Sequence, residues 1–188
     1  MRKCIFYRVP KRHEKPLSPY FAFRWEHDKD PQTFFKLLYN LDADHLEFKV
    51  SILGQTYERD QPIFEEAKTR LAKHIVNFGQ PPSKEDYHGI LRTADVVVST
   101  ALHETFGVAM LEATYLGCYP LVPDRLVYPE IYPAECIYRT EAQLAKRLKQ
   151  FIRCPGAARR KSVAIDFSKF SADGWDIFGK VRKNLEKK

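Results

Sequence analysis

Residues 94–123, ADVVVSTALHETFGVAMLEATYLGCYPLVP, have the pattern of a strand, a helix and a second strand. The β-branched run at 95–99 is typical of a strand that is buried on both faces of a parallel sheet. The apolar segment 106–116 predicts a helix that ends at Gly117, and residues 119–123 predict the next strand. Two parallel strands joined by a helix form a β-α-β unit, so this stretch favours an α/β fold.

The same alternation continues on both sides of this stretch. We expect further strands at 20–23, 46–53 and 74–78, and helices that begin at Asp30-Pro31 or cover 62–73, 83–93 and 140–151. Repeated alternation of strand and helix predicts a Rossmann-like α/β domain, with a parallel sheet and helices on both faces. The domain is expected at 20–165, between a basic, proline-rich linker at 1–19 and a C-terminal extension at 166–188 with a helix over 173–186.

The composition favours an anionic partner and an intracellular location. Lys and Arg number 31 against 24 Asp and Glu, and much of the excess lies in 1–15 and 146–188. These basic ends fit either a nucleic-acid partner or two solvated chain ends. The four cysteines form no CxxC pair and have no His at zinc-like spacing, which predicts reduced thiols. Without a membrane-length apolar run or a signal peptide, we expect a cytoplasmic or nuclear protein that has no membrane partner.

Three familiar fingerprints are missing from the sequence. It has no GxGxxG, no GxxxxGK[ST] and no GxSxG motif, which argues against a dinucleotide enzyme, a P-loop NTPase and an α/β-hydrolase. In open parallel sheets, ligands bind outside the carboxyl ends of the strands. Here those ends are followed by Arg24, Gly54, Gly79, Gln80, the segment 99–107 and the segment after Pro123, which are therefore the candidate site.

The segment after the strand at 95–99 predicts an anion site. Thr105, Phe106 and Gly107 lead directly into a helix, whose free N–H groups and positive dipole end attract an anion such as a diphosphate. Gly107 has no side chain to keep a ligand away. Glu112, inside this helix, can accept two hydrogen bonds from a ribose diol, and Glu104 would face the group beyond the diphosphate.

Another interpretation needs no ligand. Glu112 could pair with an Arg or Tyr of the core, and Glu104 could be a solvated loop residue. Arg24 and Lys29, five residues apart after the first strand, weigh against it. Both cations could reach a diphosphate at the neighbouring helix end.

The residues Glu104 and Glu112 with FG between them, after the buried ADVVVS strand, resemble the E-x7-E motif of retaining glycosyltransferases with two Rossmann domains, the GT-B architecture. Arg24 and Lys29 match the R-x4-K motif of the same family, in its C-terminal domain. The resemblance implies that Glu112 binds the ribose of a nucleotide sugar and that Glu104 binds the donor sugar. Arg24 and Lys29, helped by the backbone of Phe106 and Gly107, would bind the diphosphate.

The resemblance also implies that Gly79 and Gln80 line the base and that no metal or cofactor is needed, because Arg and Lys take its place. RWEHDKDPQTFFKLL (24–38) and HETFGVAMLEATYLGCYPLVPDRLVYPEIYPAE (103–135) are most similar to the branch that glycosylates queuosine in tRNA. That branch implies GDP-mannose as donor and tRNA as acceptor. The chain resembles only the C-terminal half, so the acceptor-binding N-terminal Rossmann domain is missing, and 166–188 would be the crossover helix.

Two functions of other classes stay open at this point. One is a non-catalytic RNA-binding module that uses the basic ends, and it predicts RNA affinity that falls steeply with salt. The other is a Rossmann scaffold whose cleft has no nucleotide preference. The sequence lacks the combined aromatic and basic motifs of RNA modules, so a donor-binding domain that is inactive alone is the leading hypothesis.

Overall fold

The structure is a computed structural model that describes residues 20–24, 27–54, 61–161 and 163–165. The expected linker at 1–19 and the expected helix over 173–186 lie outside these residues. Within the described ranges, no helix combines the length and the apolar character that crossing a bilayer requires.

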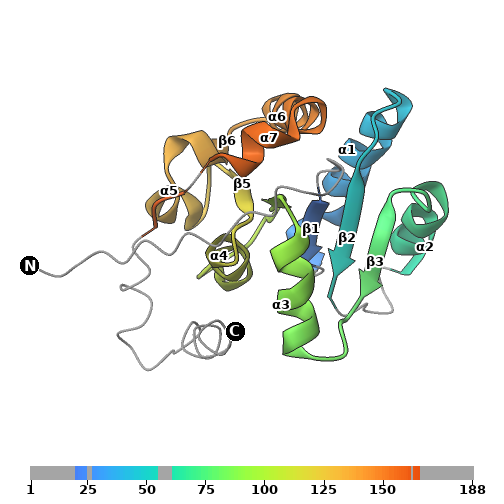
Figure 1. The fold of residues 1–188 in the computed structure, drawn as a ribbon, viewed down its shortest axis with the longest axis horizontal. Helices are drawn as coiled ribbons and strands as arrows, with labels where there is room; N and C mark the ends of the chain where they lie inside the picture. The colour runs from blue at the N-terminus through green and yellow to red at the C-terminus, as the bar shows by residue number, and fades with distance from the viewer. Residues whose placement is uncertain (1–19, 25–26, 55–60, 162, 166–188) are drawn as a thin grey trace, which may run out of the picture.

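A parallel sheet forms the centre of the fold (Figure 1). Its strands are β1 (Tyr20–Arg24), β2 (Lys49–Leu53), β3 (Ile75–Gly79), β4 (Val96–Val98), β5 (Tyr119–Pro123) and β6 (Ile137–Tyr138). They lie in the order β3-β2-β1-β4-β5-β6, and every neighbouring pair is parallel. This is the strand order of a doubly wound Rossmann sheet, so the predicted fold class is confirmed.

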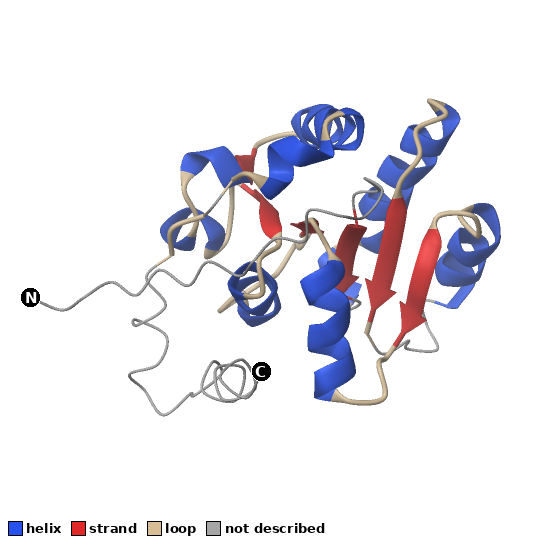
Figure 2. Cartoon of the chain, in the orientation of Figure 1, coloured by secondary structure: helices blue, strands red, loops and turns tan. Residues whose placement is uncertain are grey.

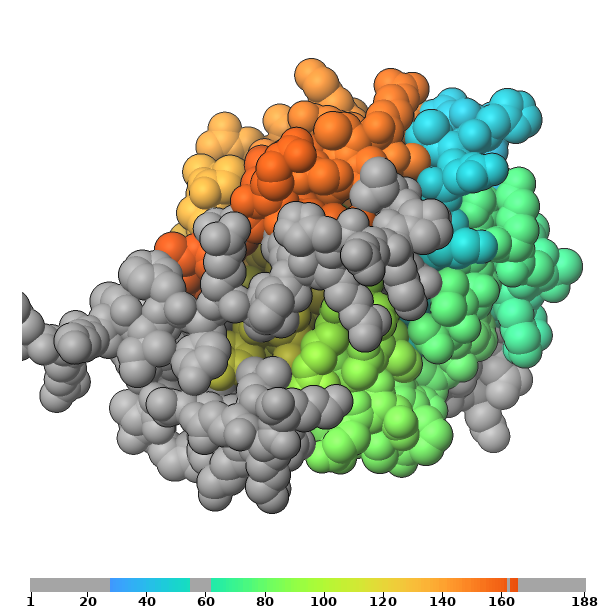
Figure 3. All heavy atoms as spheres, in the orientation of Figure 1, coloured from blue at the N-terminus to red at the C-terminus, as the bar shows by residue number. Residues whose placement is uncertain are grey.

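Helices cover both faces of this sheet (Figure 2). They are α1 (Pro31–Ala43), α2 (Gln61–Arg70), α3 (Lys84–Thr93), α4 (Val108–Tyr115), α5 (Tyr128–Ile131), α6 (Glu141–Arg153) and α7 (Pro155–Arg159), with short 3₁₀ turns at His27–Lys29 and Ala134–Cys136. Helix α1 packs against α2 and α6, whereas α3 packs against α4. The atoms of α3 and α4 lie side by side at the molecular surface (Figure 3).

The predicted helix starts are confirmed by their capping bonds. Asp30 accepts from the N–H of Thr33 at 3.1 Å, and Pro31 occupies the first turn. Ser83 and Thr140 cap α3 and α6 in the same way. A side-chain oxygen that satisfies a free N–H of the first turn stabilises a helix by about 1 kcal/mol. Because each of these bonds joins residues three positions apart, the helix starts could be predicted from the sequence.

Some elements were shifted or missed. The strand expected at 46–53 begins only at Lys49, and the helix expected at 106–116 begins at Val108 because Gly107 adopts a left-handed φ of 66°. The two-residue strand β6 and the short helices α5 and α7 were not predicted. Elements this short have almost no periodicity, so they form only because tertiary contacts support them.

An ion pair ties α7 to the residue before β4. Nε of Arg159 donates to Asp95 Oδ1 at 2.6 Å, and Nη2 donates to Asp95 Oδ2 at 2.9 Å. The side chains of Arg159 and Asp95 are only 21% and 10% exposed. The hydrogen bonds to Asp95 raise the pKa of Arg159, and this effect is larger than the lowering that burial causes. The forked geometry suits a carboxylate and is among the stronger polar contacts of a protein.

Replacing Arg159 with leucine is therefore expected to lower the free energy of unfolding by about 2 kcal/mol, because the carboxyl group of Asp95 loses its cation in a largely buried place. Urea unfolding measures this. The exposed pair of Arg139 and Asp124, at 2.8 Å, is the matched control, and Arg139→Leu should cost less than about 0.5 kcal/mol. Equal losses in the two variants would contradict the expectation.

Candidate functional site

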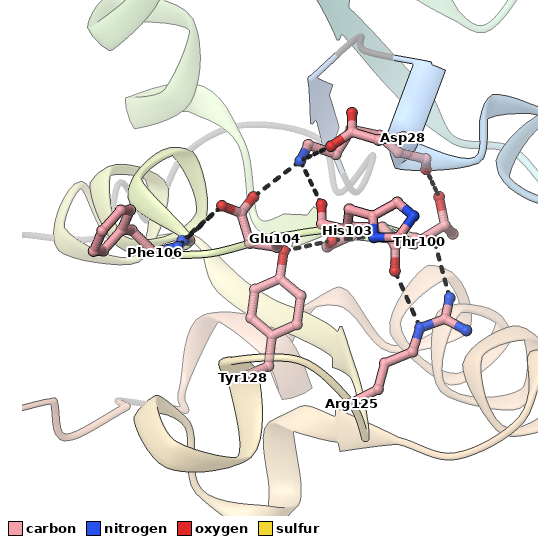
Figure 4. Close-up of polar contacts among 11 residues, drawn as sticks. Asp28, Thr100, His103, Glu104, Phe106, Arg125 and Tyr128 are labelled. Carbon is pink, nitrogen blue, oxygen red and sulfur yellow. Dashed lines mark hydrogen bonds and ion pairs between the residues drawn. The ribbon is translucent and has the colours of Figure 1, made fainter.

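The candidate site lies where the strand order reverses, at the carboxyl ends of β1 and β4. Connections after these adjacent strands run in opposite directions, which opens a crevice for a ligand. Here the two loops are joined by hydrogen bonds. The N–H of Leu102 donates to Asp28 O at 2.7 Å, and Thr100 Oγ1 donates to Lys29 O at 2.6 Å (Figure 4). The sheet topology therefore brings together two segments that are about 70 residues apart.

Lys29 lies between these two loops, where its Nζ contacts three oxygen atoms of residues that the structure describes. Its Nζ is 2.9 Å from Asp28 Oδ2, 2.8 Å from His103 O and 3.2 Å from Glu104 Oε2. The side chain is only 12% exposed. Burial opposes the charge, but the bonds to Asp28 and Glu104 outweigh it and raise the pKa of Lys29. The site therefore contains a firmly held positive charge.

Glu104 joins this cation to the start of α4. Its Oε1 accepts from the N–H of Gly107 at 2.9 Å and from the N–H of Phe106 at 3.3 Å (Figure 4). Burial opposes ionisation, yet these N–H groups and Lys29 lower the pKa of Glu104. The arrangement binds an anion, and the anion is the carboxylate of Glu104 itself. We had expected Glu104 to lie beyond a diphosphate, and the N–H groups of Phe106 and Gly107 to bind the phosphates. In this structure Glu104 itself accepts the hydrogen bonds from these N–H groups.

The backbone of Gly107 explains why the loop can take this shape. Its φ of 66° is left-handed, a conformation that costs a residue with a side chain about 1 kcal/mol or more. A Cβ here would also lie 3.4 Å from Cε1 of Tyr128, a buried ring whose hydroxyl is 2.8 Å from Ser99 Oγ. The left-handed φ is therefore the main reason for a glycine here, because the contact with the ring would be close to an ordinary van der Waals distance. The openness of Gly107 toward a ligand stays a prediction, since the residue is buried in this structure.

Arg125 lies in the segment after Pro123, which was one of the candidate loops, but we had not expected a role for this residue. Its Nε donates to Ala101 O at 3.0 Å and its Nη2 donates to Thr100 O at 3.1 Å (Figure 4). These two bonds fix the loop after β4. A signal was present in the sequence, because Arg125 is the only Lys or Arg between residues 95 and 138 and follows the strand at 119–123. A lone cation that follows a strand is thus a candidate for binding the carbonyl groups of a neighbouring loop.

Glu112 lies farther along α4 and faces α3. The residue is 7% exposed, and its Oε1 is 3.1 Å from Lys84 Nζ and 3.8 Å from His88 Nε2. One of the two interpretations of Glu112 was that it pairs with an internal Arg or Tyr. The structure does show an internal partner, but this partner is Lys84. The side chain of Lys84, at the start of α3, is 51% exposed and that of Glu112 is 9% exposed, so the pair joins a buried carboxylate to a cation at the surface.

The comparison with known proteins agrees with this geometry. Residues 6–164 match the model of the glycosyl transferases group 1 family, which is most of the chain. The chain belongs to this family. Its fold is that of the C-terminal half of a GT-B glycosyltransferase, as the motifs around Glu104 and Glu112 had indicated.

Relatives of this family member include a tRNA-queuosine alpha-mannosyltransferase of Drosophila melanogaster, 43% identical over 173 residues. The match covers 92% of this chain but only 45% of the relative, so the chain spans about half the relative's length. Among solved structures, the C-terminal domain of a glycosyl transferase group 1 protein (LpcC) from Francisella tularensis superposes with a TM-score of 0.63 at 18% identity, over 87% of this chain and 85% of that one.

A second solved structure is the catalytic domain of the cholesterol-alpha-glucosyltransferase from Helicobacter pylori. It superposes with a TM-score of 0.60 at 16% identity, over 76% of this chain and 91% of that one. Identities this low establish the shared fold and leave the substrate open.

The other predicted residues of this glycosyltransferase domain lie at the same edge of the sheet. Arg24 is the last residue of β1. The N–H of Gly54, after β2, donates to the carbonyl of Gly79, the last residue of β3, at 3.1 Å. Gln80 and Thr105 are exposed. Their places agree with the predicted roles, which nevertheless remain predictions because no contact tests them.

Proposed function

We propose that this chain is the donor-binding half of a retaining glycosyltransferase that transfers mannose from GDP-mannose to queuosine in tRNA. The proposal is supported by the family match of residues 6–164 and by the identity to a tRNA-queuosine alpha-mannosyltransferase. In the transfer, the bond between the anomeric carbon and the diphosphate oxygen breaks, and its electron pair leaves with GDP. A hydroxyl of the acceptor forms the new bond to the anomeric carbon, and its proton passes to the diphosphate of the leaving GDP.

The observation that carries the proposal is the contact of Glu104 with Lys29 and with the N–H groups of Phe106 and Gly107. Lys29 and the two N–H groups already hold one anion, so they suit the diphosphate of the donor. In the bound state we propose that the diphosphate takes these donors and that Glu104 turns to the hydroxyls of the sugar. Preformed donors at the leaving oxygen would stabilise the charge that grows there.

Glu112 is the proposed ligand of the ribose. It lies in α4, whose first turn would meet the diphosphate, and its carboxylate is oriented by α3. Gly54, Gly79 and Gln80, at the ends of β2 and β3, would lie toward the base. The carboxylate accepts hydrogen bonds and donates none, which matches the two hydroxyls of a ribose.

The complete reaction needs more than these residues supply. The chain covers 45% of the relative's length, and we propose that a second Rossmann domain binds the tRNA and closes over the donor. Closure positions the acceptor and excludes water. The chain alone is expected to bind GDP weakly and to transfer no sugar.

Calorimetric titration of this chain with GDP, UDP and ADP tests the donor assignment. We expect GDP to bind most tightly and Glu112→Gln to weaken it about tenfold, because a charge-assisted hydrogen bond is lost. Glu130→Gln, on the exposed face of α5, is the control and should leave the affinity unchanged. If none of the three nucleotides bound at millimolar concentration, or if Glu112→Gln had no effect, the proposal would be wrong.

A further inference from the structure

His88 is a buried histidine on α3 that faces the carboxylate of Glu112. The residue is 3% exposed, and its Nε2 lies 3.8 Å from Glu112 Oε1. Among the residues that the structure describes, this nitrogen has no hydrogen-bond partner. A buried polar atom without a partner weakens the fold. A leucine would fill such a place without that cost, so the nitrogen points to a role other than packing.

The contacts of Glu112 suggest what that role is. Lys84 and His88 both approach the same oxygen, Oε1, at 3.1 Å and 3.8 Å. They differ in mobility, because the Lys84 side chain is 51% exposed, whereas the ring of His88 is enclosed between α3 and α4. A long, exposed lysine holds a carboxylate loosely. A buried ring on a helix is the more rigid of the two possible supports for this carboxylate.

The charge state of His88 fits a neutral donor. Burial is the main influence and lowers the pKa of His88, and Lys84 and Arg92 act in the same direction, against the opposite effect of Glu112. A neutral imidazole has one N–H. With that proton on Nε2, an approach of less than about 1 Å brings the nitrogen within hydrogen-bonding distance of the carboxylate.

We propose that His88 is a positioning residue for Glu112: its Nε2–H holds Oε1 from the side of α3, so that the carboxylate meets the ribose hydroxyls of the donor in a fixed orientation. This inference rests on the proposed function, in which Glu112 binds the ribose. It adds that part of the selectivity for a ribose lies in α3, in a residue that does not touch the ligand. Orientation of a binding group by a neighbouring hydrogen bond is a general device in binding sites.

The test compares the affinity for GDP with the affinity for 2′,3′-dideoxy-GDP, which lacks both hydroxyls. This ratio isolates the ribose contact from any general change in the fold. The natural chain should prefer GDP about tenfold. In His88→Asn, whose amide is too short to reach Glu112, and in His88→Leu, the preference should fall below about threefold. His88→Gln, whose amide can replace Nε2–H, should retain most of it.

The controls separate this inference from the proposed function. Tyr39→Phe removes another buried oxygen without a hydrogen bond among the described residues, on α1, and should keep the natural preference. A preference unchanged in His88→Asn and His88→Leu but lost in Glu112→Gln overturns the role of His88 alone. If the natural chain does not distinguish the two nucleotides, the ribose role of Glu112 fails and the inference fails with it.

Discussion

Replacing Lys29 with methionine is expected to weaken the binding of GDP about a hundredfold and to lower the free energy of unfolding by about 3 kcal/mol. Methionine keeps much of the length of the lysine but removes its charge. Asp28, Glu104 and the carbonyl of His103 then lose the cation that they share within 3.2 Å. Both carboxyl groups would then lie, without this cation, close to the place proposed for the diphosphate. Calorimetry measures the binding, and urea unfolding measures the stability.

Lys36→Met is the matched control for this change. Lys36 also forms an ion pair with a glutamate, Glu141, but at 3.6 Å and with both side chains more than 60% exposed. Such pairs contribute about 0–1 kcal/mol, so both measurements should stay near those of the natural chain. If Lys29→Met bound GDP as tightly as Lys36→Met, Lys29 would not be a ligand of the diphosphate.

Replacing Glu104 with glutamine is expected to have opposite effects on binding and on transfer. In this chain, GDP should bind about tenfold more tightly, because a neutral amide competes less well for the N–H groups of Phe106 and Gly107 and does not repel a diphosphate. In a complete protein with both halves, transfer should fall at least about a hundredfold, because the contact to the sugar in the transition state is lost. Unchanged transfer would remove Glu104 from the catalytic residues.

The same variant has a clear dependence on pH. The pKa of Glu104 is lower in the folded chain than its ordinary value. The ionised carboxylate therefore contributes stability that is fully present above the ordinary carboxyl pKa, about 4.3, and is lost as the pH falls through the lower, folded-state value. The natural chain should be more stable than Glu104→Gln at pH 7, and the difference should shrink below about pH 4. A difference that grows in acid would contradict the ion pair with Lys29.

Several parts of the fold were predictable because their causes are local. The β-branched run Val96–Val98 predicted a buried strand, and Asp30, Ser83 and Thr140 predicted helix starts through bonds that span three residues. Interactions this close in sequence do not depend on the rest of the chain. The spacing of Glu104 and Glu112 indicated the family in the same way, since a motif is a local pattern.

The site was predictable only as a set of candidates. Lys29 and Glu104 could be assigned to neighbouring strand ends, because parallel strands bring their carboxyl ends to one edge. The sequence did not show that Glu104 would occupy the first N–H groups of α4. A loop carboxylate can face solvent, a cation or a helix start at similar cost, and the choice depends on neighbours that lie far along the chain.

The sequence by itself determined the α/β alternation, the helix starts and the motif residues, because periodicity, capping and short spacings act within a few residues. Only the tertiary structure decided that Arg125 holds the loop after β4 and that Lys84 and His88 of α3 lie beside the carboxylate of Glu112. It also decided that α7 forms around the pair of Arg159 and Asp95. These contacts join residues 24 to 64 positions apart, and their free energy exists only after the sheet has brought the segments together.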